Sequence, residues 1–263
     1  MTAGCIHYRA TGKTTLLDVA RKAGDCLYET FMHTDRHFVG YSSIMGLVSL
    51  YRTTGDKKYL DVADHFVNMQ GTGDADHRRD NPPDDGRGTD LRQDRVPLRE
   101  ETEAVGHSVW GNYLYCGAAD VNAENGDRKM YAALERIWES VALRKMDITG
   151  SVVMGAGKSP RGDSVNEAFG HDYAQPNKYN ETCANIGNGM FSRRMLLLSG
   201  DAKYADVMEL VAYNCVNAAV DLEGENWFYC NPLHWEGEAV KGHIHHTGLR
   251  WRTQAPQALP ALW

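Results

Sequence analysis

A short turn motif centred on glycine, here called a glycine mark, occurs four times in this 263-residue chain. It constrains the fold more than any other feature. In each mark a glycine stands between two stretches with apolar periodicity, at Thr11-Gly12-Lys13, Thr54-Gly55-Asp56, Asn125-Gly126-Asp127 and Ser199-Gly200-Asp201. Glycine accepts the left-handed conformation that ends a helix, and Asp favours the N-terminus of the next helix. Each mark therefore predicts a helix, a tight turn and a second helix.

The stretches beside the glycines have helical spacing. After the second mark, for example, apolar residues recur at intervals of three and four, at Leu60, Ala63, Phe66 and Val67. The preceding helices are predicted over residues 42–53, 103–124 and 181–198. A single hairpin cannot bury its apolar face, so stacked hairpins must close on one another or be capped. The chain is therefore predicted to be all-α and to form a helical toroid rather than a simple bundle.

Composition excludes several classes of protein. A hydrophobic content of 42% and a charged content of 24% are ordinary for a soluble globular domain. The net charge of −7 argues against nucleic-acid binding, which needs a basic stripe. There is no run of about 18 apolar residues and no N-terminal secretion signal, so neither membrane insertion nor export is expected. The six cysteines include no CxxC pair and do not predict a disulfide scaffold, so we expect reduced thiols and a cytoplasmic location.

Two connections are long for a compact helical domain. Residues 71–102 are rich in Asp, Arg, Gly and Pro, and residues 150–180 are rich in Gly and then in aromatic residues. Loops of this length are usually functional or disordered. We expect the first connection to be partly disordered and the second to carry the chemistry.

The second connection leads into residues able to act on a substrate. Glu167 lies beside Phe169 and Tyr173, so burial could raise its pKa and make it a general acid; the alternative is a solvated loop carboxylate. Glu181 and Cys183, at i and i+2, would face the same side of an extended segment and supply half of a tetrahedral zinc site. The alternative there is an exposed glutamate beside a buried structural cysteine.

Three further residues are candidates for contacting a ligand. His107, early in a predicted apolar helix, could hydrogen-bond a sugar hydroxyl or be a satisfied core histidine. Glu209 lies on the last predicted helix, where membership of the polar face is the alternative. Tyr229 belongs to residues 226–232, a segment typical of a short aromatic strand near the C-terminus, so it could bind a ligand or pack in the core.

The order of these segments resembles the catalytic domain of glycoside hydrolase family 127, the β-L-arabinofuranosidases. The matching segments follow one another over about residues 8 to 251. They include residues 54–61, 97–100, 103–107, 113–115, 118–120, 145–150, 167–170, 181–184, 204–209, 213–214 and 228–233. Each segment alone is a weak signal, whereas the ordered series is specific.

The resemblance implies a partial (α/α)6 barrel over residues 1–251, followed by a tail over 252–263 that does not match the family. It also implies a zinc ion held by one Glu and three Cys, with one thiolate as the nucleophile of a retaining glycosidase that acts on a small carbohydrate. By position, Glu181 and Cys183 correspond to metal ligands and Glu167 to the acid/base. The substrate-contacting positions correspond to His107, Glu209 and Tyr229.

The chain also departs from the family pattern. The family has an adjacent Cys-Cys pair after a segment like residues 248–251, whereas no cysteine follows Cys230 here. We therefore expect a chain truncated at both ends, with impaired turnover. Tyr41 stands where the family has His. Two alternatives stay open, which are a metal-free glycosidase with two carboxylates, and a non-catalytic fragment that binds ligands or forms a homo-oligomer through exposed apolar faces.

Overall fold

The computed structural model describes residues 1–34, 40–71, 92–152, 154–158, 164–169, 180–222, 224–228, 231 and 233, and only the backbone of 154–158 and 164–168. Its α-helices are α1 (Thr2–Thr11), α2 (Thr15–Phe31), α3 (Ser42–Thr54), α4 (Lys57–Asn68), α6 (Ser108–Asn125), α7 (Arg128–Arg144), α8 (Thr182–Ser199) and α9 (Ala202–Val211). Short helical turns are η2 (Leu98–Glu100), η3 (Ala212–Val216) and η4 (Asn217–Ala219). Two antiparallel strands, β1 (Met154–Lys158) and β2 (Ser164–Phe169), complete the described elements.

All four glycine marks end a helix, as predicted. Gly12, Gly55, Gly126 and Gly200 have φ angles of 71°, 73°, 69° and 75°, in the left-handed region that other residues enter at a steric cost. An Asp follows three of these glycines and caps the next helix, because its carboxylate accepts a hydrogen bond from the amide two residues later. The residues within each glycine mark therefore determine where one helix ends and the next begins.

The aspartate cap of α7 is the strongest of these. The carboxylate of Asp127 accepts hydrogen bonds from the amides of Lys129 (2.8 Å) and Met130 (3.2 Å) and from Nε of Arg99 (2.7 Å). We expect Asp127→Ala to lower the free energy of unfolding by about 1–2 kcal/mol, because an N-cap contributes about 1 kcal/mol and a partly exposed ion pair adds less. Urea denaturation measures this loss. Asp201→Ala, which removes a single cap bond to Lys203, is the matched control and should cost less.

The same carboxylate makes stability depend on pH. Burial raises the pKa of Asp127, but the hydrogen bonds from Arg99 and the two backbone amides outweigh it, so the pKa lies below its ordinary value. A carboxyl group with a lowered pKa stabilises the fold above its unfolded pKa of about 3.9, and this contribution is lost as pH falls through the folded pKa. The stability difference between wild type and Asp127→Ala should shrink below about pH 4. An equal difference in acid and at neutral pH would contradict this.

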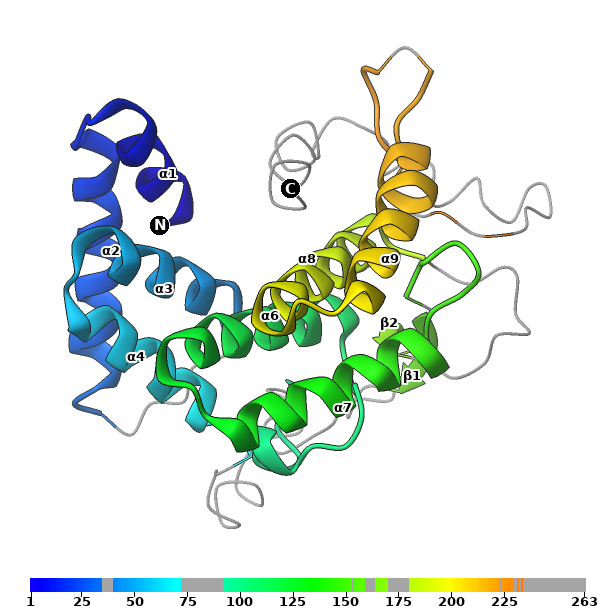
Figure 1. Cartoon of the computed structure of the whole chain (residues 1–263), viewed down its shortest axis with the longest axis horizontal. Helices are drawn as coiled ribbons and strands as arrows, with labels where there is room; N and C mark the ends of the chain where they lie inside the picture. Colours follow the sequence, from blue (N-terminus) through cyan, green and yellow to red (C-terminus); the bar gives the residue numbers. More distant parts are fainter. Residues whose placement is uncertain are drawn as a thin grey trace.

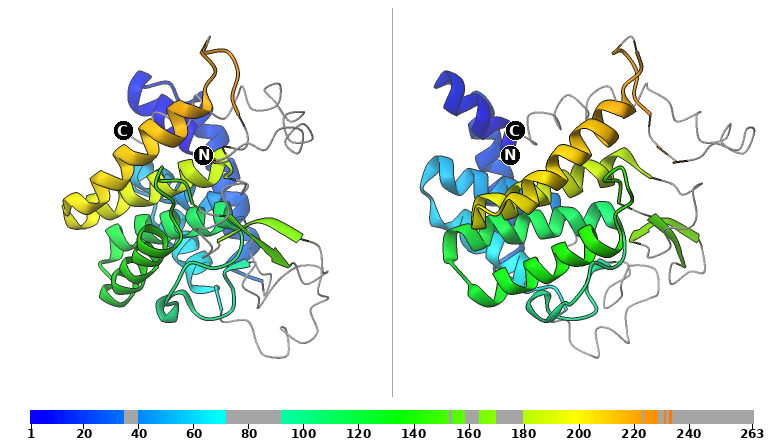
Figure 2. Two further views of the ribbon diagram at one scale, coloured as in Figure 1. Left: turned by 90° about the vertical axis from the view of Figure 1, so that its right-hand side faces the viewer. Right: turned by 45° about the vertical axis from the view of Figure 1, so that its right-hand side comes forward.

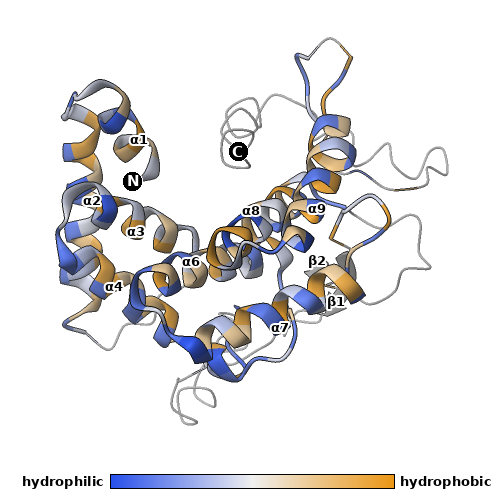
Figure 3. Cartoon of the chain, in the orientation of Figure 1, coloured by the Kyte–Doolittle hydropathy of each residue, from blue (hydrophilic) through white to orange (hydrophobic). Residues whose placement is uncertain are grey.

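The helices form two layers. α1 contacts α3, α3 contacts α6, and α6 contacts α8, so the first helices of the four hairpins form an inner layer. The hairpins follow one another along an arc (Figure 1). α6 is buried over most of its length, because an inner helix has neighbours on several sides. The outer helix α7 carries both hydrophilic and hydrophobic residues (Figure 3). This is the predicted partial (α/α)6 barrel.

Two glycines let the inner helices approach one another closely. A Cβ atom on Gly117 of α6 would lie 2.7 Å from Cβ of Ile44 in α3. A Cβ atom on Gly187 of α8 would lie 2.8 Å from Cβ of Asn112 in α6. Since cores are packed to near-crystalline density, a larger residue at either position would push the two helices apart.

The structure corrects two expectations and leaves a third unconfirmed. The helix predicted from residue 103 begins at Ser108, because Gly106 has a φ of 69° and His107 is extended. The connection over residues 150–180 contains β1 and β2, which the sequence did not predict. The aromatic strand near the C-terminus is not confirmed, since Trp227 makes only an isolated bridge to Val220. No helix in the described ranges is long and apolar enough to cross a lipid bilayer.

The β-hairpin lies beside the N-terminal end of α6 (Figure 2). The amide of Phe169, at the end of β2, donates to the carbonyl of Gly106 at 2.9 Å. Its ring stacks with Tyr115, with 6.4 Å between ring centroids, and occupies space that a Cβ atom on Gly111 would need. Phe169 therefore attaches the hairpin to the inner layer.

Candidate active site

The turn before α8 carries the two residues predicted to bind metal. Glu181 is the N-cap, with φ −71° and ψ 131°, and the helix begins at Thr182. The extended conformation thus includes Glu181 but not Cys183, which corrects the expected extended pair. Glu181 is 3% exposed and Cys183 is partly exposed, the reverse of an exposed glutamate beside a buried cysteine.

Tyr113 of α6 lies close to both of these residues. Cys183 and Tyr113 pack against a small cluster formed by Val109 and Ala184. Burial raises the pKa of Tyr113, and electrostatic interactions with the ionisable groups of Cys183, Cys116 and Glu181 raise it further. Its hydroxyl therefore stays protonated at neutral pH and can donate a hydrogen bond. Sequence reasoning gave Tyr113 no site role, because spacing alone does not show that α6 brings it to the start of α8.

The hydroxyl of Thr182 connects the same turn to the last described segment. Thr182 Oγ1 donates to the carbonyl of Phe228 at 2.6 Å and accepts from Nδ2 of Asn231 at 2.8 Å. Tyr229 itself lies outside the described residues. Phe228 and Asn231, which precede and follow it in the sequence, nevertheless bond to the turn that carries Glu181.

A second set of hydrogen bonds holds Asn180, the residue before Glu181. The carbonyl of Asn180 accepts from the amide of Asn231 at 2.8 Å, and Nδ2 of Asn180 donates to Asp147 at 3.0 Å. Asp147 also accepts from the amides of Thr149 and Ser151, which closes the loop after α7. The turn is thus hydrogen-bonded to two segments that are distant in sequence.

His107 was expected to lie within a helix. Instead it is the N-cap of α6, just before the first helical residue. Its Nδ1 accepts from the amide of Trp110 at 3.4 Å, and the two rings stack with centroids 4.1 Å apart and an interplanar angle of 14°. Because Nδ1 accepts, the proton of the neutral imidazole sits on Nε2. The guanidinium of Arg92 lies 4.3 Å from the centroid of the Trp110 ring, within cation–π range.

The other predicted site residues are placed less completely. Glu167 lies in β2, two residues before Phe169, and its side chain is outside the described atoms. Glu209 is exposed on α9. Tyr41 is buried at the start of α3, and its hydroxyl donates to Gln70 and to the carbonyl of Arg92. The described atoms therefore bring together Glu181 and Cys183, but they do not bring Glu209 to that pair.

The donors at the start of α8 fit zinc in kind but not in number. Zinc takes carboxylate, thiolate or imidazole ligands and usually four of them. Within the described ranges, no group of three or more His, Cys, Asp or Glu residues could hold a metal ion. Burial also raises the thiol pKa of Cys116 to about 12 and that of Cys215 to about 11, so these sulfurs stay protonated at neutral pH. Glu181 and Cys183 thus offer two donors of the kinds that zinc takes, half the usual number.

The arc of helical hairpins defines the protein as an (α/α)6-barrel protein. Distant solved structures share this fold, including a glycosyl hydrolase of family 88 from Bacteroides vulgatus. That structure has a TM-score of 0.54 and 13% sequence identity, and the match covers 89% of this chain and 64% of the other. At this identity the likeness concerns the fold alone.

The chain belongs to the family of the GH127 β-L-arabinofuranosidase catalytic domain, whose model matches residues 1–255. A non-reducing end β-L-arabinofuranosidase from Bifidobacterium longum subsp. longum is 30% identical over 246 residues, which cover 88% of this chain and 36% of the relative. The crystal structure of a GH127 β-L-arabinofuranosidase from Geobacillus stearothermophilus T6 has a TM-score of 0.78 and 34% identity, over 91% of this chain and 38% of that chain. The chain therefore spans less than two fifths of the length of these relatives.

Proposed function

We propose that this chain forms part of the catalytic domain of a retaining glycosidase that hydrolyses a terminal β-L-arabinofuranosyl residue or a related furanoside. One observation supports the proposal most directly: Glu181 is buried at the start of α8, close to Cys183 on the same helix and to Tyr113 on α6. By resemblance, Glu181 and Cys183 correspond to metal ligands of the family. The name of the Bifidobacterium relative, a non-reducing end β-L-arabinofuranosidase, supports a terminal sugar as the substrate.

Each candidate residue has a defined chemical role in this proposal. Zinc, when bound, would lower the pKa of a coordinated thiol so that the thiolate exists at neutral pH. Glu181 and Cys183 would supply two of its ligands. Glu167 would act first as general acid and then as general base, and retention would follow from two successive displacements. The hydrogen bonds to the sugar would come from His107, Glu209 and Tyr229.

The start of α8 suits a negatively charged donor set. The N-terminus of a helix carries partial positive charge and stabilises anions in its first turn. Glu181 is the N-cap and Cys183 is the second helical residue, so both lie in this region. Tyr113 adds a protonated hydroxyl beside them. These features support Glu181 and Cys183 as metal-binding or anionic groups rather than as parts of an inert core.

We further propose that the 263-residue chain alone has little or no turnover. Its sequence matches two of the four family ligands and contains no adjacent Cys-Cys pair, so the nucleophile has no counterpart. Assaying a full-length relative with the same substrate distinguishes an impaired chain from an unsuitable substrate.

Zinc content and turnover of the full chain test the proposal together. With two of the usual four ligands, we expect the chain to bind added zinc weakly, and we expect Cys183→Ser and Glu181→Gln to lose this binding. Cys26→Ser is the matched control, because Cys26 is an exposed cysteine on α2 and its loss should leave zinc content unchanged. With a nitrophenyl β-L-arabinofuranoside we expect hydrolysis far below that of an intact relative.

Two results would count against the proposal. Zinc content that is the same in Cys183→Ser and wild type would remove the metal-binding role of this pair. Turnover comparable to an intact relative in a metal-free preparation would contradict both the zinc role and the impairment, and would favour the two-carboxylate mechanism.

A further inference from the structure

Gln93 has an unusual backbone and a buried side chain. Its φ is 52°, the only positive value among the described non-glycine residues, and it is 3% exposed. A left-handed backbone is unfavourable for a residue with a Cβ atom and persists where the surrounding structure holds it. Its Nε2 donates to the carbonyls of Val105 (2.8 Å) and His107 (3.1 Å), so one side chain holds two points of the segment before α6.

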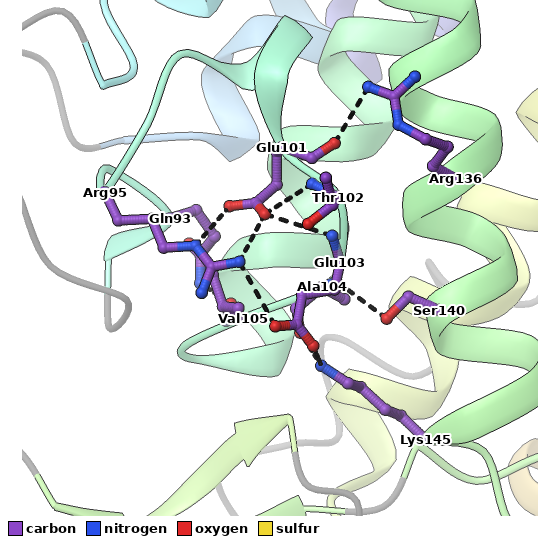
Figure 4. Close-up of polar contacts among 10 residues, drawn as sticks. All are labelled: Gln93, Arg95, Glu101, Thr102, Glu103, Ala104, Val105, Arg136, Ser140 and Lys145. Carbon is purple, nitrogen blue, oxygen red and sulfur yellow. Dashed lines mark hydrogen bonds and ion pairs between the residues drawn. The ribbon is translucent and has the colours of Figure 1, made fainter.

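An ionic network holds the start of the same segment (Figure 4). Arg95 makes two contacts with the carboxylate of Glu101, at 2.9 Å and 2.6 Å. The same carboxylate accepts from the amides of Thr102 (2.8 Å) and Glu103 (3.2 Å). The side chain of Glu101 is 5% exposed, so these bonds replace water as its partners.

The C-terminal end of α7 supports the middle of the segment. Lys145, which is 1% exposed, donates to Glu103 at 3.0 Å and to the carbonyl of Ala104. The hydroxyl of Ser140 accepts from the amide of Ala104 at 3.2 Å. A buried ammonium needs such partners. Residues 101–107 are therefore held at their start and end by Arg95 and Gln93, and in their middle by the C-terminal end of α7.

This segment connects two parts of the proposed site. Its last residue is His107, whose ring stacks on Trp110. The carbonyl of Gly106 accepts from the amide of Phe169, at the end of the strand that carries Glu167. A displacement of the segment would move His107 and the end of β2 together.

We propose that Gln93 is a positioning residue, which holds the ring of His107 against Trp110 through the backbone carbonyls of Val105 and His107. The importance of this geometry for catalysis rests on the proposed role of His107 as a sugar contact. The positioning itself does not require that a sugar binds.

Proton NMR of the full chain tests the proposal. The stacked geometry places the ring protons of His107 over Trp110, so they should be shifted upfield, and His107→Gln identifies their signals. We expect Gln93→Met, which keeps the length of the side chain and removes its donors, to abolish this upfield shift. Ser140→Ala removes a single hydrogen bond to the amide of Ala104 in the same segment, so it should reduce the upfield shift without abolishing it.

Asn122→Leu is the matched control, because Asn122 is also a buried amide that donates to a backbone carbonyl, but near the C-terminal end of α6, at the opposite end from His107. It should leave the His107 signals in place. An unchanged His107 signal in Gln93→Met, or an equal change in Asn122→Leu, would overturn the positioning role. Failure of His107→Gln to weaken the binding of L-arabinose would instead count against the proposed sugar contact, without affecting the result on Gln93.

Discussion

Asp120→Ala should lower the free energy of unfolding by about 3–5 kcal/mol, because it leaves a buried guanidinium without its counter-charge. Asp120, on α6, accepts from Nε of Arg194 on α8 at 2.8 Å and from Nη1 of Arg52 on α3 at 3.3 Å. The side chain of Arg194 is 14% exposed, so water can replace the lost carboxylate only in part. Urea denaturation with a two-state fit measures the change.

Two controls separate the buried charge from a general loss of packing. Asp61→Ala removes an exposed ion pair with Lys57, and exposed pairs contribute about 0–1 kcal/mol. Replacing both Asp120 and Arg194 by Leu should recover part of the lost stability, since a buried pair can often be replaced by apolar residues at little cost. A loss of less than about 1 kcal/mol in Asp120→Ala would show that Arg194 finds another partner.

Phe169→Ala should cost about 3 kcal/mol, and it should also detach the β-hairpin from the helices. The ring is 9% exposed, stacks with Tyr115 and fills the space above Gly111. A two-stranded hairpin is marginally stable alone, so β1 and β2 need this anchor. Amide hydrogen exchange measures the local effect, and urea denaturation measures the global one.

Phe228→Ala is the matched control, because Phe228 is exposed and surface substitutions usually change stability by less than about 0.5 kcal/mol. Faster exchange should appear in β1 and β2 of Phe169→Ala and not in those of the control. If the exchange rates of the strand amides stayed at the wild-type level, Phe169 would not be the anchor of the strand that carries Glu167.

Much of the fold could be predicted from the sequence, because its signals are local. Each glycine mark combines a left-handed residue with a cap for the next helix, and both act within a few residues. The helical periodicity of the flanking stretches follows from the need to bury one face. Even so, the start of α6 was predicted five residues too early. Glu103 and Ala104 fit a helical pattern, but Gly106 in the left-handed region and the extended His107 interrupt it.

The site was less predictable, since it depends on contacts between distant segments. Sequence spacing identified Glu181 and Cys183 as a pair, but it did not predict which of them is buried. Tyr113 and Gln93 gave no signal of their own, because their roles come from α8 and from the segment before α6, respectively. The strands β1 and β2 were missed because a Gly-rich stretch has weak strand propensity and is held by Phe169.

The sequence by itself determined the hairpins, their turns and the order of the segments that mark the family, since these depend on interactions between neighbouring residues. Only the tertiary structure decided that Glu181 is buried beside Tyr113. It also decided that His107 caps α6 and stacks on Trp110, and that Gln93 donates to the backbone carbonyl of His107. Burial and hydrogen-bond partners are set by the packing of elements far apart in the chain, which no short sequence pattern encodes.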